Sequence, residues 1–198
     1  MNISDIFKYK YVLASKSPRR VKLLKQIGLD FISVDSDYDE IQGNKYKPID
    51  LIEHNSSAKA GIVSKKYPGN IIIAADTIVT INRNILNKPE NKEQATKFLR
   101  FLSGKKHIVY TGITVINTIN KKSLFDFTKT NVYFRKLNPE EISYYIKNHT
   151  PLDKAGAYGI QDDFGCLFID KINGDYYNVV GLPLVKLYEM LLKVIKSK

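Results

Sequence analysis

The stretch VLASKSPRRVKLLKQIG, residues 12–28, decides the fold, because a β-rich segment passes into a helix within a few residues. Val21, Leu24 and Ile27 recur at helical spacing, and Leu23 adds a second apolar row. The Ser-Pro before this pattern suits a helix N-cap and first helical position, and the glycine after it suits the helix end. A strand that leads directly into a helix is the basic unit of an α/β protein.

The same alternation continues along the chain. The predicted strands are residues 10–15, 31–34, 71–81, 107–119, 123–134 and 165–172, and the predicted helices are residues 18–27, 48–66, 92–102, 139–148 and 182–196. A short polar turn separates residues 107–119 from residues 123–134, so these two strands are expected to form an antiparallel hairpin. We therefore expect an α/β fold with a mixed sheet, in a single domain over residues 1–198.

The chain is strongly basic, since 31 lysines and arginines against 20 acidic residues give a formal net charge of +11. Such a balance is one mark of a nucleic-acid-binding protein. The lysines, however, are spread as isolated pairs such as Lys65-Lys66 and Lys105-Lys106, with no basic block and no aromatic-basic stripe. We expect most of them to be solvated surface charge, with a subset that serves an anionic small molecule, so nucleic acid is not the expected partner.

Composition also bears on the location of the protein. Cys166 is the one cysteine, which excludes a disulfide within the chain. The N-terminal residues do not have the pattern of a signal peptide, and no apolar run is long enough to span a membrane. We expect a cytoplasmic protein that makes no use of a membrane.

The chain has five arginines, and two of them, Arg19 and Arg20, stand side by side in the first turn of the predicted helix 18–27. Cations oppose the helix dipole at this end, so stability alone would favour acidic residues there. Free backbone N–H groups and two planar guanidinium groups instead form an anion site, for which phosphate is the usual guest. The alternative is that both arginines point to water or pair with an acid elsewhere.

Asp76 interrupts the apolar strand 71–81, in the motif IIIAADTIV. A buried carboxylate without a partner is costly, so this position needs a cation, a metal or an exposed strand end. An aspartate that caps a local turn is the alternative, but β-branched and apolar residues continue on both sides. We therefore predict that Asp76 is a metal ligand or a general base.

Other candidate site residues are scattered along the chain. Asp39 and Glu40 lie in a polar loop and could help to hold a divalent cation, or could simply be solvated. Further candidates stand beside small or turn residues: Lys59, Lys88, Lys154 and Gln161. The sequence contains no zinc-ligand spacing, no Walker A motif and no Gly-x-Gly-x-x-Gly, so a phosphate site must be built differently.

Five collinear blocks give a more specific signal: LASKSPRR (13–20), AADTIV (74–79), LSGKKHIVYTG (102–112), DKAGAYGIQ (153–161) and GDYYNVVGLPL (174–184). Together they resemble the Maf family of nucleoside triphosphate pyrophosphatases, over nearly the whole chain. The paired arginines after Ser-Pro and the Asp-Thr in the strand resemble the subgroup that acts on dTTP and UTP. The chain departs from the family pattern at Asn55-Ser56, at Ala74 and at Asp162.

The resemblance implies an elongated mixed sheet flanked by helices, with two lobes around a central cleft. It also implies a divalent cation (Mg²⁺ or Mn²⁺), a nucleoside triphosphate substrate, a cytoplasmic location, a homodimer, and a link to septum formation and cell-division arrest. By position, Asp76 matches the family's proton acceptor, and base selection falls to Arg19, Thr77 and Gln161. The charged residues Glu40, Lys59 and Lys88 match positions that line the family's cleft.

These observations combine into one hypothesis. Asp76 activates a water that attacks the α-phosphorus, and Glu40 and Asp76 hold the cation. The substrate-binding residues are then Ser15, Arg19, Arg20, Lys59, Thr77, Lys88, Lys154 and Gln161. The alternative is a basic nucleic-acid-binding or division-regulatory protein without turnover.

Overall fold

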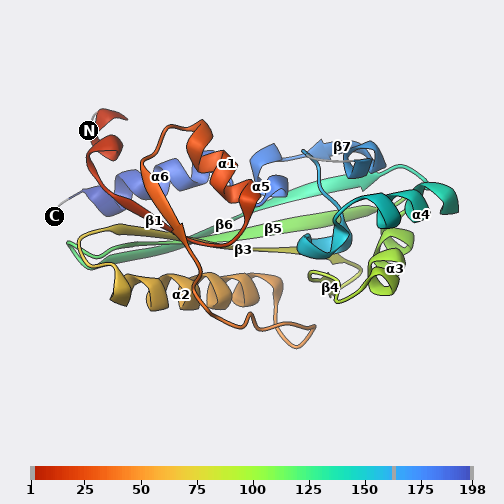
Figure 1. Ribbon diagram of the computed structural model, residues 1–198, viewed down its shortest axis with the longest axis horizontal. Helices are drawn as coiled ribbons and strands as arrows, with labels where there is room; N and C mark the ends of the chain where they lie inside the picture. Colours follow the sequence, from red (N-terminus) through yellow and green to blue (C-terminus); the bar gives the residue numbers. More distant parts are fainter. Residues whose placement is uncertain (1–2, 162–163, 197–198) are drawn as a thin grey trace.

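A seven-stranded mixed sheet forms the long axis of the molecule (Figure 1). The computed structural model describes residues 3–161 and 164–196. The strands are β1 (Tyr11–Ala14), β2 (Phe31–Val34), β3 (Ile71–Ile81), β4 (Asn84–Leu86), β5 (Lys106–Asn117), β6 (Lys122–Phe134) and β7 (Ile169–Asn173). The α-helices are α1 (Pro18–Gln26), α2 (Pro48–Lys66), α3 (Lys92–Leu102), α4 (Pro139–Asn148), α5 (Tyr176–Val180) and α6 (Leu184–Ile195). Short 3₁₀ helices are η1 (Ile3–Lys8), η2 (Pro151–Asp153), η3 (Ala155–Ala157) and η4 (Phe164–Phe168).

The sheet has the strand order β2-β1-β3-β5-β6-β7, and β4 pairs with β3 beside this path. β1 runs parallel to both β2 and β3, whereas the other pairs are antiparallel. β3, β5 and β6 are long enough to run through both ends of the molecule (Figure 1). The expected mixed sheet and the hairpin of β5 and β6 are both confirmed.

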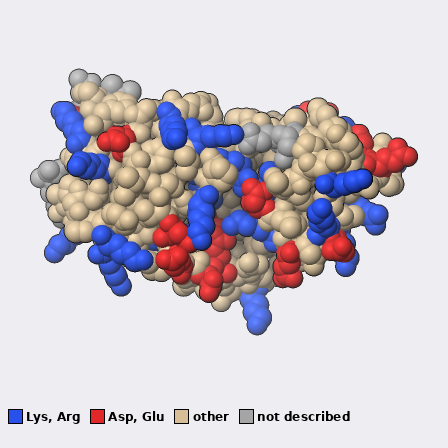
Figure 2. Space-filling view, in the orientation of Figure 1, with Lys and Arg blue, Asp and Glu red and all other residues tan. Residues whose placement is uncertain are grey.

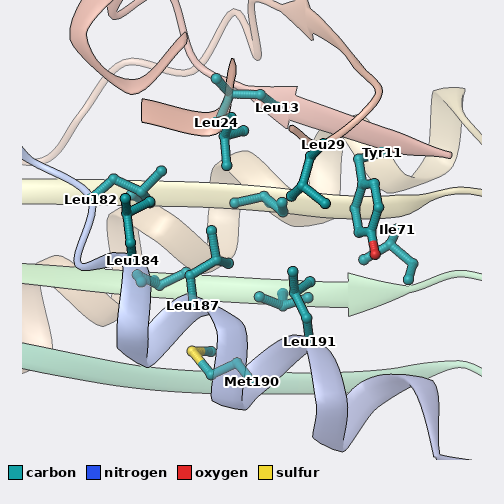
Figure 3. Packing of buried hydrophobic residues seen from close by; sticks show 14 of the residues in the cluster. Tyr11, Leu13, Leu24, Leu29, Ile71, Leu182, Leu184, Leu187, Met190 and Leu191 are labelled. Atoms are coloured by element: carbon teal, nitrogen blue, oxygen red, sulfur yellow. The ribbon is translucent and has the colours of Figure 1, made fainter. Parts of the chain in front are cut away.

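Helices cover both faces of the sheet, and the alternation of side chains along β3 decides what each face buries. Ile71, Ile73 and Ala75 point into a core with α1 and α6, whereas Ile72 and Ala74 pack against α2. Figure 3 shows the first core, where side chains of α1 and α6 meet those of β1 and β3. Because both faces are buried, β3 is apolar along nearly its whole length, as the sequence predicts.

The far end of the molecule forms the second lobe around α3, α4, β4 and β7 (Figure 1). Its core gathers Leu99 of α3, Tyr145 of α4 and Phe134 of β6 around the fully buried Phe168. The long strands therefore connect two separate hydrophobic cores, and a cleft can open between them. None of the helices in the described part of the chain has both the length and the apolar character that a membrane span requires.

The helix α1 matches the sequence expectation closely. Ser17 caps it by accepting a hydrogen bond from the Arg20 N–H, and Pro18 takes the first helical position. At its other end Gly28 adopts φ 73°, its N–H donates to the Lys25 carbonyl, and the Leu29 N–H donates to the Leu24 carbonyl. This pair of bonds is a Schellman motif, which needs the left-handed conformation that glycine adopts without strain.

Most predicted elements are present, but one prediction is partly wrong. The helices 48–66, 92–102 and 139–148 have the predicted bounds, and the last helix is shorter than predicted at both ends. The predicted strand 165–172 begins only at Ile169, because the preceding residues form η4. In η4 the Leu167 and Phe168 carbonyls accept hydrogen bonds from Arg135, and the Phe168 ring fills the core. These carbonyls are therefore satisfied without the hydrogen bonds of a β-sheet.

Candidate functional site

A cleft between the two lobes lies where one edge of β3 is open. On this edge β3 pairs with β1 as far as Ile73 and with β4 from Val79, and within the described residues no strand covers residues 74–78. The cavity beside this interval has a volume of about 710 Å³ and is lined by residues of both lobes. Asp76 and Thr77 lie in the middle of the open interval, so the topology itself exposes them to the cleft.

The cavity brings together every residue that the sequence singled out for substrate, metal or catalysis. They are Ser15, Arg19, Arg20, Asp39, Glu40, Lys59, Asp76, Thr77, Lys88, Lys154 and Gln161. They come from the loop after β1, the first turn of α1, the loop before α2, α2 itself, β3, the loop between β4 and α3, and the segment after α4. Their placement in one cavity is a finding, whereas their individual roles stay predictions.

Asp76 faces α2, on the side of the sheet where its even-numbered neighbours pack. Its side chain is only 5% exposed, and its two oxygens have different partners. Oδ2 accepts a hydrogen bond from the Asn55 amide at 2.8 Å, and Oδ1 lies 3.5 Å from the Lys59 ammonium. The buried carboxylate therefore has both the donor and the cation that such a position requires.

Lys59 joins the two candidate carboxylates. Its buried ammonium lies 2.6 Å from Glu40 Oε1 and also donates to the Ala75 carbonyl at 3.1 Å. Lys88 approaches the other oxygen of Glu40 at 3.4 Å from a more exposed position. Burial would raise the pKa of Glu40, but Lys59 and Lys88 outweigh it and lower that pKa to about 2. Glu40 is thus an anion at any physiological pH.

Arg20 connects three segments at the floor of the cleft. Its Nε donates to the Gly181 carbonyl at 2.8 Å, Nη1 to Ser15 Oγ at 3.2 Å and Nη2 to Thr77 Oγ1 at 3.0 Å. Burial lowers the pKa of its guanidinium, against the opposing attraction of Asp76 and Glu40. A guanidinium has five N–H groups, so bonds from three nitrogens to the protein still leave donors for an anion.

Arg19 has a different environment from Arg20. Its Nη1 lies 2.6 Å from Asp153 Oδ2, and its Nη2 donates to the Asp153 carbonyl at 2.8 Å. Of the two alternatives for this arginine, pairing with an acid elsewhere is the one that the structure contains. The pair links α1 to η2 of the other lobe, so Arg19 closes one side of the cleft.

Asp153 also orients a second cation of the cleft. The buried Lys154 ammonium lies 3.0 Å from Asp153 Oδ1 and donates to Thr150 Oγ1 at 3.0 Å. Arg19 and Lys154 lower the pKa of Asp153 against the opposing effect of its burial. Asp153 therefore stays ionised between these two cations and holds them in place.

Thr77 points to the face of the sheet opposite Asp76 and belongs to a chain of hydroxyl groups. Thr111 donates its single hydroxyl proton to the Asn178 carbonyl at 3.0 Å, so the 3.0 Å bond between Thr77 and Thr111 must use the proton of Thr77. Thr77 Oγ1 in turn accepts from Arg20. Toward the cleft, the Thr77 hydroxyl can therefore only accept a hydrogen bond.

The lining of the cleft is partly charged and partly apolar. Lysines, Arg20 and carboxylates line it together with the apolar side chains of Val79, Val109, Val179 and Val180 and the ring of Tyr158. Figure 2 shows basic side chains scattered over this face of the molecule, and acidic side chains gathered mainly near its middle and at one end. A ligand with an anionic part and a flat apolar part fits this mixed lining.

The carboxylates of the cleft are few, which decides how a divalent cation could bind there. Within residues 3–161 and 164–196, no group of three or more His, Cys, Asp or Glu side chains could hold a metal by itself. Mg²⁺, however, commonly takes one or two carboxylates and completes its shell with water and substrate phosphates. Glu40 and Asp76, bridged by Lys59, fit this second pattern.

Sequence reasoning missed two residues that organise the cleft, Asn55 and Asp153. Asn55 lies four residues before Lys59, so both side chains project from one face of α2 toward Asp76. That spacing was a usable signal, because two polar residues interrupt the buried face of a helix. Asp153 precedes Lys154 in a turn, and nothing local distinguishes it from a solvated acid. Asp162, one of the departures from the family pattern, lies outside the described residues.

Comparison with known proteins shows the family of this chain. The family model described as Maf-like protein matches residues 10–194. A dTTP/UTP pyrophosphatase of Dictyoglomus thermophilum is 44% identical to this chain, and the match covers 93% of this chain and 95% of that protein. A dTTP/UTP pyrophosphatase of Alkaliphilus oremlandii is 48% identical, and the match covers 89% of this chain and 91% of that protein. The Ham1 protein of Staphylococcus aureus matches 93% of this chain and 98% of its own with a TM-score of 0.53 at 14% identity, which shows a shared fold. From residue 10 to residue 194, the chain belongs to the Maf family.

Proposed function

We propose that this chain is a nucleoside triphosphate pyrophosphatase that hydrolyses dTTP and UTP to the monophosphate and pyrophosphate. The observation that carries the proposal is the buried Asp76 carboxylate, which faces a cleft that Arg20, Lys59 and Lys88 also line. The substrates are those in the names of the relatives from Dictyoglomus and Alkaliphilus.

The mixed lining of the cleft suggests how the substrate binds. The triphosphate lies against Arg20, whose planar guanidinium group donates to phosphate oxygens, and the lysines of the lining offset its charge. The pyrimidine packs against the valines and Tyr158 of the lining, within reach of Arg19, Thr77 and Gln161.

Asp76 is the proton acceptor in this proposal. Its Oδ1 takes a proton from a water as the water oxygen bonds to the α-phosphorus. The bond between the α-phosphorus and the oxygen that bridges to the β-phosphorus breaks, and pyrophosphate leaves with that oxygen. Lys59, Lys88 and Arg20 stabilise the negative charge that moves onto the leaving group. No covalent intermediate with the protein is required.

Glu40 and Asp76 are the residues that would hold a divalent cation. A bound Mg²⁺ or Mn²⁺ would neutralise phosphate charge and orient the phosphate oxygens. Cytoplasmic location, a homodimer and a link to cell-division arrest remain predictions from the resemblance.

The direct test is pyrophosphate release from a panel of dTTP, UTP, CTP, GTP and 7-methyl-GTP, with and without Mg²⁺ or Mn²⁺. We expect cation-dependent release that is fastest with dTTP and UTP. If no nucleotide releases pyrophosphate while DNA or RNA binds with strong salt dependence, the nucleic-acid-binding alternative is correct.

Arg20→Ala is expected to weaken nucleotide binding more than turnover. Removal of the guanidinium takes away the parallel N–H groups that would donate to phosphate oxygens. KM should therefore rise by at least about tenfold, with a smaller change in kcat. Arg20→Lys is the matched variant, because lysine keeps the positive charge but lacks the planar pair of N–H donors. Its KM should lie between those of the wild type and Arg20→Ala. Unchanged kinetic constants in both variants would refute the phosphate role of Arg20.

Thr111→Val is expected to reduce the preference for UTP over CTP by about tenfold in kcat/KM. Uracil and thymine present an N–H donor at ring position 3, where cytosine presents an acceptor. In the wild type, Thr77 can only accept at the cleft, so it favours the N–H donor; without the Thr111 hydroxyl, Thr77 can also donate. The measurement is kcat/KM for both nucleotides.

Thr114→Val is the control for this change. Thr114 is equally buried on the same strand, but its hydroxyl contacts Ser56 and Ser57 of α2. The UTP/CTP ratio should stay unchanged in Thr114→Val. An equal loss of selectivity in both variants would mean that the UTP/CTP ratio depends on the packing of β5 and not on the hydrogen bond between Thr77 and Thr111.

A further inference from the structure

Asn55 links two parts of the cleft that are distant in the sequence. It lies on α2, is only 2% exposed, and forms three hydrogen bonds. Its Oδ1 accepts from the Ile41 N–H at 3.0 Å, and its Nδ2 donates to the Ile41 carbonyl at 3.1 Å and to Asp76 Oδ2 at 2.8 Å. Both amide protons and the amide oxygen are therefore in use.

The orientation of this amide follows from its partners. If the amide were flipped, its oxygen would face the Ile41 carbonyl and the Asp76 carboxylate, which are both acceptors, and its NH₂ would face a donor. The Ile41 backbone thus fixes which atom of Asn55 reaches Asp76. A donor that is already oriented by the backbone holds the carboxylate better than a freely rotating group does.

The same residue also fixes the loop that carries Glu40. Residues 35–47 connect β2 to α2 without a helix or strand, and Ile41 follows Glu40 directly. Asn55 holds the backbone of this loop at Ile41, and one helical turn later Lys59 holds the Glu40 side chain. Two residues of α2, four positions apart, therefore fasten both the loop and the Asp76 carboxylate to one helix.

We propose that Asn55 is a positioning residue for the hydrolysis, which fixes Asp76 Oδ2 and the Glu40 loop so that Asp76 Oδ1 faces the substrate water. This inference rests on the proposed role of Asp76 as the proton acceptor. Asn55 binds Oδ2, which leaves Oδ1 on the side of Lys59, a residue that lines the cleft. Without the amide, the carboxylate can rotate and the loop loses its two backbone bonds, so fewer molecules have the reactive geometry.

The test compares Asn55→Leu and Asn55→Asp with a control at Asn117. Leucine removes all three bonds at similar volume, whereas aspartate keeps the acceptor for the Ile41 N–H and removes both donors. Asn117 is as buried as Asn55, with 2% of its surface exposed. Its side-chain amide donates to the Val194 carbonyl and accepts from the Ile119 N–H, so it also bonds to the backbone on both sides of the amide. It lies at the end of β5 opposite the start of β3, away from the residues that line the cleft.

We expect kcat for dTTP to fall by at least about tenfold in both Asn55 variants. A loss of this size corresponds to the removal of one hydrogen bond to a charged group. KM should change by less than about threefold, and so should the dissociation constant of a UTP analogue with a methylene bridge between its α- and β-phosphorus. Asn117→Leu should also lower the unfolding temperature, while its kcat stays within about twofold of the wild type.

A second comparison separates positioning from a general loss of structure. In the Asp76→Asn background, Asn55→Leu should lower kcat by less than about twofold, because no base remains to be positioned. An undiminished tenfold loss in that background, or a kcat for Asn55→Leu and Asn55→Asp equal to that of the wild type, would overturn the positioning role. If Asp76→Asn itself retains wild-type turnover, the proposed function of Asp76 fails instead, so the two failures are distinguishable.

Discussion

Asp76→Asn should lower kcat for dTTP and UTP by at least about 100-fold, because general base catalysis contributes roughly 10²–10⁴ in rate. The substitution keeps the size of the side chain and an oxygen that can accept from Asn55, but it removes the basic carboxylate. The nucleotide still meets Arg20 and the lysines, so the dissociation constant of the methylene-bridged UTP analogue should change by much less than kcat. The measurement is pyrophosphate release at saturating substrate.

A carboxylate outside the cleft gives the control for this substitution. Asp126 on β6 pairs with Lys186 of α6 at 2.9 Å, and neither residue lines the cavity. Asp126→Asn removes an ionised carboxylate from an ion pair in the same protein, yet kcat should remain close to that of the wild type. Near-normal turnover in Asp76→Asn would remove Asp76 from the chemistry and assign the activation of water to another group.

The sequence predicts β3 and the position of Asp76 within it well, because a strand that is buried on both faces has a distinctive apolar pattern. A strand that is covered by α2 on one side and by α1 and α6 on the other must be apolar at successive positions, so one aspartate within it is conspicuous. The capped helix α1 and its paired arginines are conspicuous for a similar reason, since they oppose the helix dipole. In both cases local physics alone separates the candidate site residue from its neighbours.

The partners of these residues are much harder to predict, because they depend on the topology. Nothing local shows that β1 and β4 leave the middle of β3 uncovered, and the three-residue strand β4 is too short for a periodic signal. The pairing of Arg19 with Asp153 joins residues 134 positions apart, and the bond from Asn55 to Asp76 joins a helix to a strand. The sequence identifies the charged groups, and the fold decides which of them neutralise one another.

Lys59→Met should destabilise the protein by about 3 kcal/mol near neutral pH, because removal of one partner from a buried ion pair leaves the other charge uncompensated. The Lys59 ammonium is almost fully buried between Glu40 and Asp76, and the methionine that replaces it fills similar space without charge. Lys88→Met is the matched control. Lys88 approaches the same Glu40 at 3.4 Å but is mostly exposed, so its loss should change the free energy of unfolding by less than about 0.5 kcal/mol.

The pH dependence of this difference tests its electrostatic origin. In the wild type the pKa of Glu40 is about 2, below its usual 4.5, so its ionisation contributes stability that is present above pH 4.5 and is lost as the pH falls toward 2. In Lys59→Met the burial of Glu40 is no longer offset by that cation, so the pKa of Glu40 should rise and this contribution should disappear. The difference between wild type and variant in urea unfolding should therefore be largest near pH 7 and shrink toward about pH 3. A difference that stays constant over this range would mean that Lys59 stabilises the fold through the packing of its alkyl chain, and that the two carboxylates do not depend on its charge.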